Sequence, residues 1–144
     1  MRALTAYLRA EQLVIHTSSS TEAGFWVACN PVIVTTIDEA PEVIGHIAKY
    51  MLPYSRTNIR TPPPNEMNAT SVLKAAGVKT WASLSKNALC VSIEENGAQI
   101  TFVPARNVSA RLGFEELTEK AFSLLSPSAQ ALGKALLDAF DLAE

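Results

Sequence analysis

The segment LCVSIEENGAQITFV, residues 89–103, contains two β-rich runs on either side of a turn sequence. Apolar and polar residues alternate in both runs, which is typical of strands with one buried face. Asn96-Gly97 is the favoured pair for a two-residue type I′ turn, because both central residues of that turn need a positive φ. We therefore predict a β-hairpin whose apolar side chains share one face. The predicted pairs are Ile93 with Ile100 and Val91 with Phe102.

More strands are predicted before this hairpin. Alternating apolar residues at positions 4–8 and 13–15 indicate another hairpin with a polar turn between its strands. A polar loop then leads to two β-rich runs, residues 25–29 and 32–34, which Pro31 interrupts. Because proline cannot donate a hydrogen bond to a sheet, Pro31 indicates an edge strand or a bulge.

Residues 40–52 have the apolar spacing of an amphipathic helix. Asp38 is placed to cap this helix, and Glu39 lies near the positive end of its dipole. The following residues, 54–68, are rich in Ser, Thr, Asn, Arg and Pro, which predicts a surface loop or connector.

Two short helices and a C-terminal helix are predicted further along the chain. The short ones cover residues 70–76, ended by a glycine, and 80–86, capped by the threonine at its start. Residues 114–125 are expected to form a pair of strands, and Ser126-Pro127 is expected to open the last helix.

The two halves of the sequence correspond weakly after a shift of 88 residues. Gly45 then falls on Gly133, and Ile44 falls on Leu132. This suggests two strand-strand-strand-helix halves around a central helical insert. The order of elements predicts one α+β domain over residues 1–144, with a mainly antiparallel sheet covered by helices.

Composition indicates an ordinary globular domain: of 144 residues, 48% are hydrophobic and 18% are charged. Two cysteines cannot form a disulfide framework, so Cys29 and Cys90 are expected to be reduced. No targeting segment is visible, and the longest uncharged stretch, residues 23–37, is shorter than the roughly 18 residues that a spanning helix needs. We expect a cytoplasmic protein that is not embedded in a membrane.

The sequence offers little for catalysis or for cofactor binding. His16 and His46 are the only histidines; both are expected to face solvent, and neither can be paired with a cysteine from sequence. No metal-ligand spacing and no phosphate-binding glycine motif is present. We therefore predict no enzyme activity, no cofactor and no metal. A small thiol hydrolase that uses Cys90 or Cys29 remains an alternative.

Charge is distributed unevenly along the chain. Residues 49–86 carry six basic side chains and one acidic one, whereas both flanking segments are acidic. The basic segment also contains Tyr50, Tyr54 and Trp81, so a small nucleic-acid-binding module is a second alternative. The sequence pI of about 5.7 argues against it.

A set of short segments is densest between residues 70 and 143. These segments are Leu73-Lys-Ala-Ala-Gly-Val-Lys-Thr-Trp81, Lys86, Cys90-Val91, Ile100-Thr101, Pro104-Ala-Arg-Asn107 and Gly113-Phe114. In the first half, residues 21–24, Pro31 and the helix around Gly45 follow in the matching order. Together these segments resemble the immunity proteins of contact-dependent growth inhibition (CDI) systems, and the likeness is looser in the first half.

This resemblance implies a cytosolic protein that binds the toxic C-terminal domain of a surface-displayed effector. Many such toxins are nucleases, and an immunity protein acts by occluding the toxin's active site. If the toxin is a nuclease, acidic groups of this chain would compete with phosphate for a basic cleft. The candidate acidic residues are Glu94, Glu95, Glu115, Glu116, Asp38 and Glu39, with Glu42 and Glu119 beside them.

Other candidate contacts have two interpretations each. Lys79, with Lys74 and Lys86, would meet acidic residues if the toxin presents them. Trp81 is either a core anchor of the central helix or an interface aromatic. Arg106 and Asn107 either tie a loop down by hydrogen bonds or contact the partner. Specificity for one toxin is expected in the loops 54–68 and 108–112.

Overall fold

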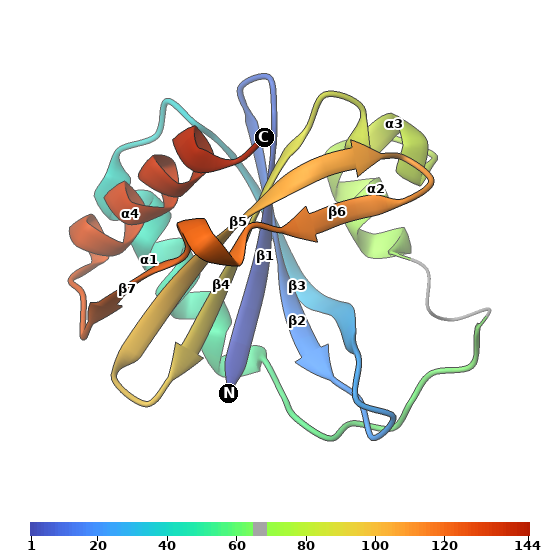
Figure 1. The fold of residues 1–144 in the computed structure, drawn as a ribbon, viewed down its shortest axis with the longest axis horizontal. Coiled ribbons are helices and arrows are strands. Elements are labelled where there is room, and N and C mark those ends of the chain that lie inside the picture. The colour runs from blue at the N-terminus through green and yellow to red at the C-terminus, as the bar shows by residue number, and fades with distance from the viewer. Residues whose placement is uncertain (65–68) are drawn as a thin grey trace.

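The computed structural model describes residues 1–64 and 69–144, which form a seven-stranded sheet with helices on both faces (Figure 1). This arrangement confirms the predicted α+β fold. Within the described ranges, no helix has the length and apolar character needed to cross a membrane. The strands are β1 Arg2–Arg9, β2 Gln12–Ser20, β3 Trp26–Thr36, β4 Leu89–Asn96, β5 Gln99–Ser109, β6 Gly113–Glu116 and β7 Phe122–Leu125. The helices are α1 Pro41–Met51, α2 Thr70–Ala76, α3 Trp81–Ser85 and α4 Ala129–Leu142, with 3₁₀ turns η1 Leu52–Tyr54 and η3 Thr118–Lys120.

The sheet is antiparallel and has the order β3-β2-β1-β4-β5-β6, with β7 also on β5. β1 and β4 form the central pair, and each half of the chain adds its next strands outward from there. The first half has the predicted strand-strand-strand-helix order, whereas the second half has four strands, β4 to β7, before α4. β3 is an edge strand, and its register with β2 shifts between His16 and Thr17, opposite Pro31. The proline therefore has the edge and bulge position that the sequence indicated.

The β4–β5 hairpin exists, but its predicted register is wrong by two residues. Asn96 pairs with Gln99, so Gly97 and Ala98 are the central residues of the turn. Gly97 alone supplies the positive φ, at 62°, which suits the first central position of a type II′ turn. Ile93 consequently lies opposite Phe102. Because the error is two residues, the apolar side chains still share the predicted face.

Three further expectations need correction. β6 and β7 do not pair with each other; each pairs with β5, at residues 105–109 and 99–102 respectively, with η3 between them. Asp38 does not cap α1, which has Ala40 at its N-cap without a side-chain hydrogen bond. Ser126-Pro127 precedes α4, whose cap is Ser128 through a bond from the Ala131 amide to its Oγ at 3.1 Å.

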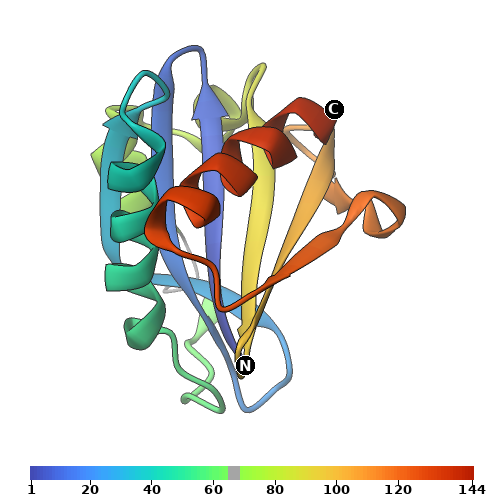
Figure 2. The same ribbon diagram turned by 90° about the vertical axis from the view of Figure 1, so that its left-hand side faces the viewer.

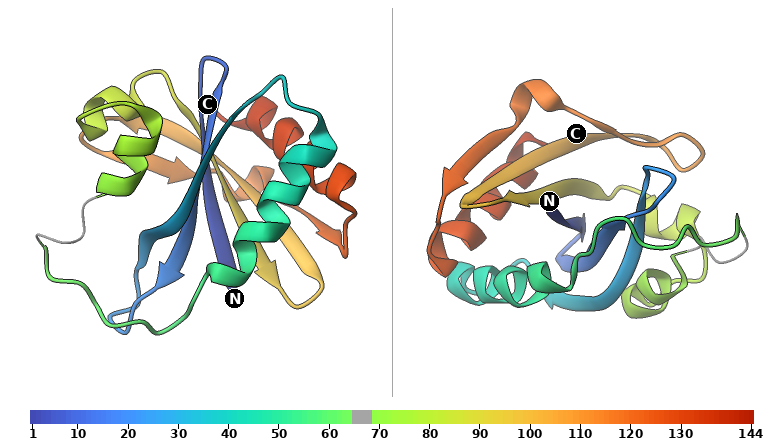
Figure 3. Two further views of the ribbon diagram at one scale, coloured as in Figure 1. Left: turned by 180° about the vertical axis from the view of Figure 1, so that it is seen from behind. Right: turned by 90° about the horizontal axis from the view of Figure 1, so that it is seen from below.

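The central helices begin and end as predicted. Thr80 accepts the Ser83 amide at 3.1 Å and caps α3, and Gly77 ends α2 in the left-handed conformation at φ 78°. Residues 54–64, the described part of the predicted connector, run along the end of β2 (Figure 3). There the backbone amide of Ser20 donates to the carbonyl oxygen of Arg56. Residues 65–68 of that prediction lie outside the described residues.

One face of the sheet is covered by α1 and α4, which lie side by side over it (Figure 2). The helices cross at Gly45 and Gly133, the two residues that the internal comparison aligned. A Cβ on Gly45 would lie 1.7 Å from the Ala129 carbonyl oxygen, and one on Gly133 would lie 1.8 Å from that of Pro41. Only glycine permits backbones to approach so closely. The main core lies beneath: Leu4, Leu13, Ile15, Ile44, Val91, Ile93, Phe102, Leu132 and Leu136 are fully buried there.

The opposite face is covered by α2 and α3 at one end only (Figure 3). A second, smaller apolar cluster fills this end, and β6 borders it. The prediction that His16 faces solvent is wrong, since its side chain is 6% exposed. The middle of β2 is buried on both faces. The reason is that α2 packs on the face of β2 that the alternating sequence predicted to be exposed. The second cluster comprises Tyr7, Val14, Val72, Ala76, Leu84, Cys90 and Ala105.

Candidate functional site

The uncovered part of the second face is hollow. Two adjoining hollows of about 350 and 110 Å³ share Thr5, Ser18 and Trp26 as lining residues, so they form one groove. We call it the open-face groove. Its other lining residues used below are Tyr7, His16, Phe25, Trp81, Ser92, Glu94 and Glu116.

The floor of the groove is made of small hydroxyl residues from three strands. Thr5 of β1 lies between His16 of β2 and Ser92 of β4 in the sheet register. Its Oγ1 is 3.0 Å from the Oγ of Ser18. Alternation along each strand sends these side chains to the face opposite the main core. Because the side chains are short, the floor lies low between the taller residues at its rim.

Aromatic side chains form the walls. Phe25 and Trp26, at the start of β3, are 39% and 42% exposed. Trp81, the first residue of α3, packs edge-on against Tyr7 with ring centroids 5.7 Å apart and also contacts Phe114. Trp81 is therefore an anchor of the second cluster that also lines the groove.

Two buried side chains border the groove with unused polar atoms. The Nδ1 of His16 lies 2.9 Å from the Thr17 carbonyl oxygen. Because a carbonyl can only accept, Nδ1 carries the proton and Nε2 is a free acceptor in the neutral ring. Burial lowers the pKa of His16 and favours that neutral form. Among the described residues, neither Nε2 of His16 nor the hydroxyl of Tyr7 has a hydrogen-bond partner.

Glu94 and Glu116 stand at the other end of the groove. Burial, and secondly the charge of Glu116, raise the pKa of the half-buried Glu94 carboxyl. No cation of the described residues forms an ion pair with either carboxylate. The fold thus places two neighbouring negative charges here without internal compensation.

The structure separates the other predicted acidic residues from this pair. Adjacent residues of a strand point to opposite faces. Glu95 accordingly faces away from the groove and pairs with Arg2 at 3.6 Å. Glu115 likewise pairs with Arg106 at 3.6 Å. Asp38 and Glu39 lie in the turn between β3 and α1, outside the groove.

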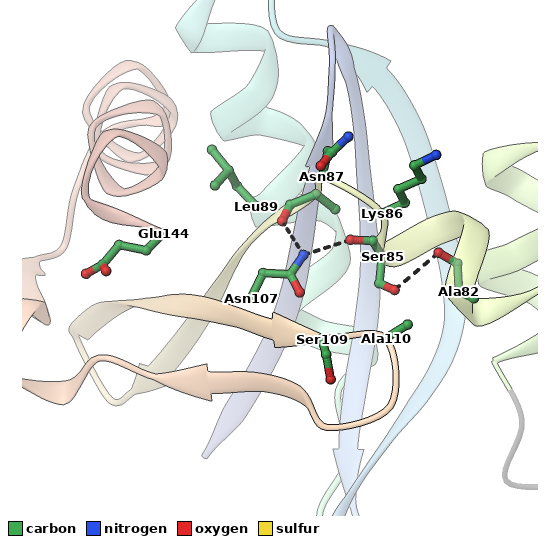
Figure 4. Close-up of a pocket in the computed structure, with 10 residues that line it drawn as sticks. Ala82, Ser85, Lys86, Asn87, Leu89, Asn107, Ser109, Ala110 and Glu144 are labelled. Carbon is green, nitrogen blue, oxygen red and sulfur yellow. Dashed lines mark hydrogen bonds between the residues drawn. The ribbon is translucent and has the colours of Figure 1, made fainter.

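Arg106 and Asn107 have mainly structural partners. Arg106 bridges Glu115 and Glu144, the latter at 3.5 Å. The side-chain amide of Asn107 donates to the carbonyl oxygens of Ser85, at 2.7 Å, and Ala88, at 3.0 Å (Figure 4). These bonds tie the α3–β4 turn to β5 and border an open cleft of about 580 Å³. Lys86 lines this cleft, whereas Lys79 is exposed in the α2–α3 connection.

Cys90 is not poised for nucleophilic chemistry. Burial, followed by the charge of Glu116, raises the pKa of Cys90 to about 12, so its thiol stays protonated at neutral pH. Both cysteines are free, and Cys29 is half-buried. The described residues contain no group of three or more His, Cys, Asp or Glu side chains that could hold a metal ion.

Sequence reasoning missed most of the groove. Of its lining residues, Trp81, Glu94 and Glu116 were candidates, whereas Tyr7, His16 and Trp26 were not. The available signal was a row of polar residues, Thr5, Ser18 and Ser92, at alternate positions of strands with apolar opposite faces. That pattern indicates a sheet face that is not fully covered.

One packed face and a partly open face with an aromatic and acidic groove are features typical of a binding protein. Residues 4–143 match the family model of the CDI immunity proteins (CdiI), so the chain belongs to that family. A comparison with curated protein sequences gave no match.

Solved structures share the whole fold. A protein of unknown function from Neisseria meningitidis, NMB0488, superposes with a TM-score of 0.79 at 19% identity, over 99% of this chain and 95% of that one. The CdiA-CT/CdiI toxin and immunity complex from Yersinia pseudotuberculosis gives 0.78 at 14% identity, over 99% and 97%. At these identities the likeness shows the fold.

Proposed function

We propose that this chain binds the C-terminal toxin domain of a CDI effector and neutralises it by occluding the active site of a nuclease. The observation that carries the proposal is the uncompensated carboxylate pair of Glu94 and Glu116 in an open groove, in a member of an immunity family. The complex from Yersinia pseudotuberculosis, in which a chain of this fold accompanies a toxin, supports a protein partner.

Charge complementarity favours a nuclease as the target. A nuclease cleft is basic because it binds phosphate, and an acidic surface can take the place of the nucleic acid there. Glu94 and Glu116 would meet the cleft, whereas Glu95 and Glu115, which face away and pair with Arg2 and Arg106, would act only at long range. Trp81 would add an aromatic contact from the groove wall. Asp38 and Glu39 lie outside the groove and would add long-range attraction to the basic cleft. Lys79, also outside the groove, would meet acidic residues if the toxin presents them, and Arg106 and Asn107 would mainly support the scaffold.

The proposal is tested with the toxin domain encoded next to this chain. Cells that express that domain should grow only when this chain is co-expressed, and calorimetry should give a tight one-to-one complex. No rescue together with no binding would overturn the proposed function.

The acidic contact is tested by charge reversal. Changing Glu94 and Glu116 together to Lys should raise the Kd at least about 100-fold, or about 2.7 kcal/mol. The matched control reverses Asp138 and Asp141, which are exposed on α4. Equal affinity of both variants would remove the basic-cleft model and leave toxin binding intact.

A nucleic-acid-binding module is the second candidate, and one observation favours it. Tyr50 and Tyr54 are 57% and 47% exposed with ring centroids 5.6 Å apart. Lys49 precedes them and Arg56 follows, which is the combination of stacking surface and positive charge that single strands use. This candidate predicts binding of single-stranded RNA or DNA that weakens steeply between 50 and 200 mM salt. The immunity proposal predicts no such binding.

A further inference from the structure

The polar groups that border the open-face groove can nearly all accept a hydrogen bond. The free Nε2 of His16 only accepts, and the carboxylates of Glu94 and Glu116 only accept. The hydroxyls of Tyr7 and of the floor residues Thr5, Ser18 and Ser92 accept as well as donate, and only the indole N–H groups of Trp26 and Trp81 cannot accept. A ligand that fills the groove must therefore supply donors, since buried polar atoms left without partners cost binding free energy.

The walls of the groove add a second requirement. Phe25, Trp26 and Trp81 present aromatic side chains around the hollow. The faces of such rings attract cations, and tryptophan does so most strongly. A ligand that carries both a positive charge and a flat surface therefore matches both the aromatic walls and the acidic end of the groove.

We propose that the open-face groove receives an arginine side chain of the toxin, which stacks on the aromatic wall and donates towards Glu94 and Glu116. The source of the arginine rests on the proposed function; the chemistry of the groove does not. Arginine has five donors in a planar, weakly hydrated cation that stacks on aromatic rings. A lysine ammonium lacks the flat surface. A phosphate would be repelled by the carboxylates, and an apolar side chain would leave Tyr7 and His16 unpaired.

The chain carries its own reporters for this contact. It contains two tryptophans, Trp26 and Trp81, and both line the groove. Their fluorescence and their indole N–H resonances therefore respond to occupation of the groove without any label.

The first experiment uses the full chain alone with blocked tripeptides. Acetyl-Gly-Arg-Gly-amide should shift both indole resonances saturably, with a Kd in the millimolar range. The same peptide with citrulline, which keeps the shape and loses the charge, should bind at least about tenfold more weakly. The lysine peptide should also bind more weakly than the arginine peptide. No saturable shift with arginine, or equal binding of citrulline or lysine, would overturn the inference.

A matched pair of variants separates the groove from bulk charge. Glu94→Gln with Glu116→Gln should weaken binding of the arginine peptide about tenfold. Asp138→Asn with Asp141→Asn makes the same change of net charge on α4 and should leave binding unchanged. Circular dichroism should show both variants folded. An equal loss in the two variants would assign the binding to net charge and contradict a specific site.

The toxin enters only in the last step, so the two proposals can fail separately. In a neutralised complex, substituting the toxin's arginines by lysine one at a time should identify one that raises the Kd at least tenfold. If the toxin is neutralised but the arginine peptide does not bind, the inference fails and the immunity function stands. If the peptide binds but the neighbouring toxin does not, the proposed function fails and the groove chemistry stands.

Discussion

The two faces of the sheet are built from the same strands and have opposite compositions. On the face beneath α1 and α4, the covered positions of the central strands are apolar, and Leu4, Ile93 and Phe102 are fully buried. Only at the strand ends does this face carry charge, where Arg2 pairs with Glu95. On the other face, the cover ends halfway along the strands, and hydroxyl residues such as Thr5 and Ser92 take over. The first face therefore carries most of the stability, whereas the second divides its length between a small core and a surface left free for binding.

The sharpest test uses neighbouring residues of β4 that point to opposite faces. Ile93→Ala should lower the free energy of unfolding by about 2–5 kcal/mol, because it removes buried methyl groups and leaves a cavity. Ser92→Ala, one residue earlier, should change it by less than about 0.5 kcal/mol. Urea denaturation followed by far-UV circular dichroism measures both. Similar losses for the two variants would break the distinction between the faces.

A second test concerns the part of the second face that is covered. Asn107→Ala removes both hydrogen bonds to the α3–β4 turn and leaves two carbonyl groups without that partner. The expected loss is about 1–2 kcal/mol in urea denaturation. Lys86→Ala, across the same cleft, is the control and should have little effect. A stable Asn107 variant with impaired toxin affinity would instead make Asn107 a contact residue.

A third test uses pH to ask how well the second cluster is buried. Burial raises the pKa of Cys90 from 9.0 to about 12, so the folded state keeps the thiol protonated while the unfolded chain ionises. Its contribution to stability is complete below pH 9 and is lost as the pH rises towards 12. Between pH 8 and pH 10 the loss should be about 1.4 kcal/mol.

Substitution controls identify the responsible thiol. Cys90→Ala should remove most of that loss between pH 8 and 10, whereas Cys29→Ala should leave it in place. Chemical labelling offers an independent check, because Cys29 is half-buried and Cys90 is buried. A native chain whose Cys90 reacts as fast as Cys29 would mean that α2 and α3 open readily.

Local patterns in the sequence were sufficient to predict most elements. Alternation gave both hairpins, and Thr80 and Gly77 marked helix ends, because the interactions involved span a few residues. The register of the β4–β5 turn was missed because Asn96-Gly97 and Gly97-Ala98 both satisfy the need for a positive φ. The β5–β6 hairpin is local, with residues 110–112 between its strands, and it was missed because the strand after Gly97 was predicted to end near Val103. Pairing of β7 with β5 joins residues 122–125 to residues 99–102 around β6, and a local pattern does not contain such a contact.

The candidate site was harder to predict from the sequence for the same reason, because it also depends on contacts between residues that are distant in the chain. Adjacent glutamates were grouped by position in the chain, although a strand sends Glu94 and Glu95 to opposite faces. The groove needs the sheet order, which brings Thr5, Ser18 and Ser92 together from three strands. His16 was misjudged because the groups beside it, such as Tyr7 of β1 and Ala69 before α2, come from other parts of the chain.

The crossing at Gly45 and Gly133 also constrains how this scaffold can change over generations. Each glycine makes room for the backbone of the opposite helix, so a bulkier residue at one site cannot be relieved by any side-chain change at the other. The two halves of the domain are therefore interlocked at one point and cannot be exchanged independently with halves of relatives that cross differently. Variation between relatives should accumulate on the open face, where a new toxin can be met without moving the helices.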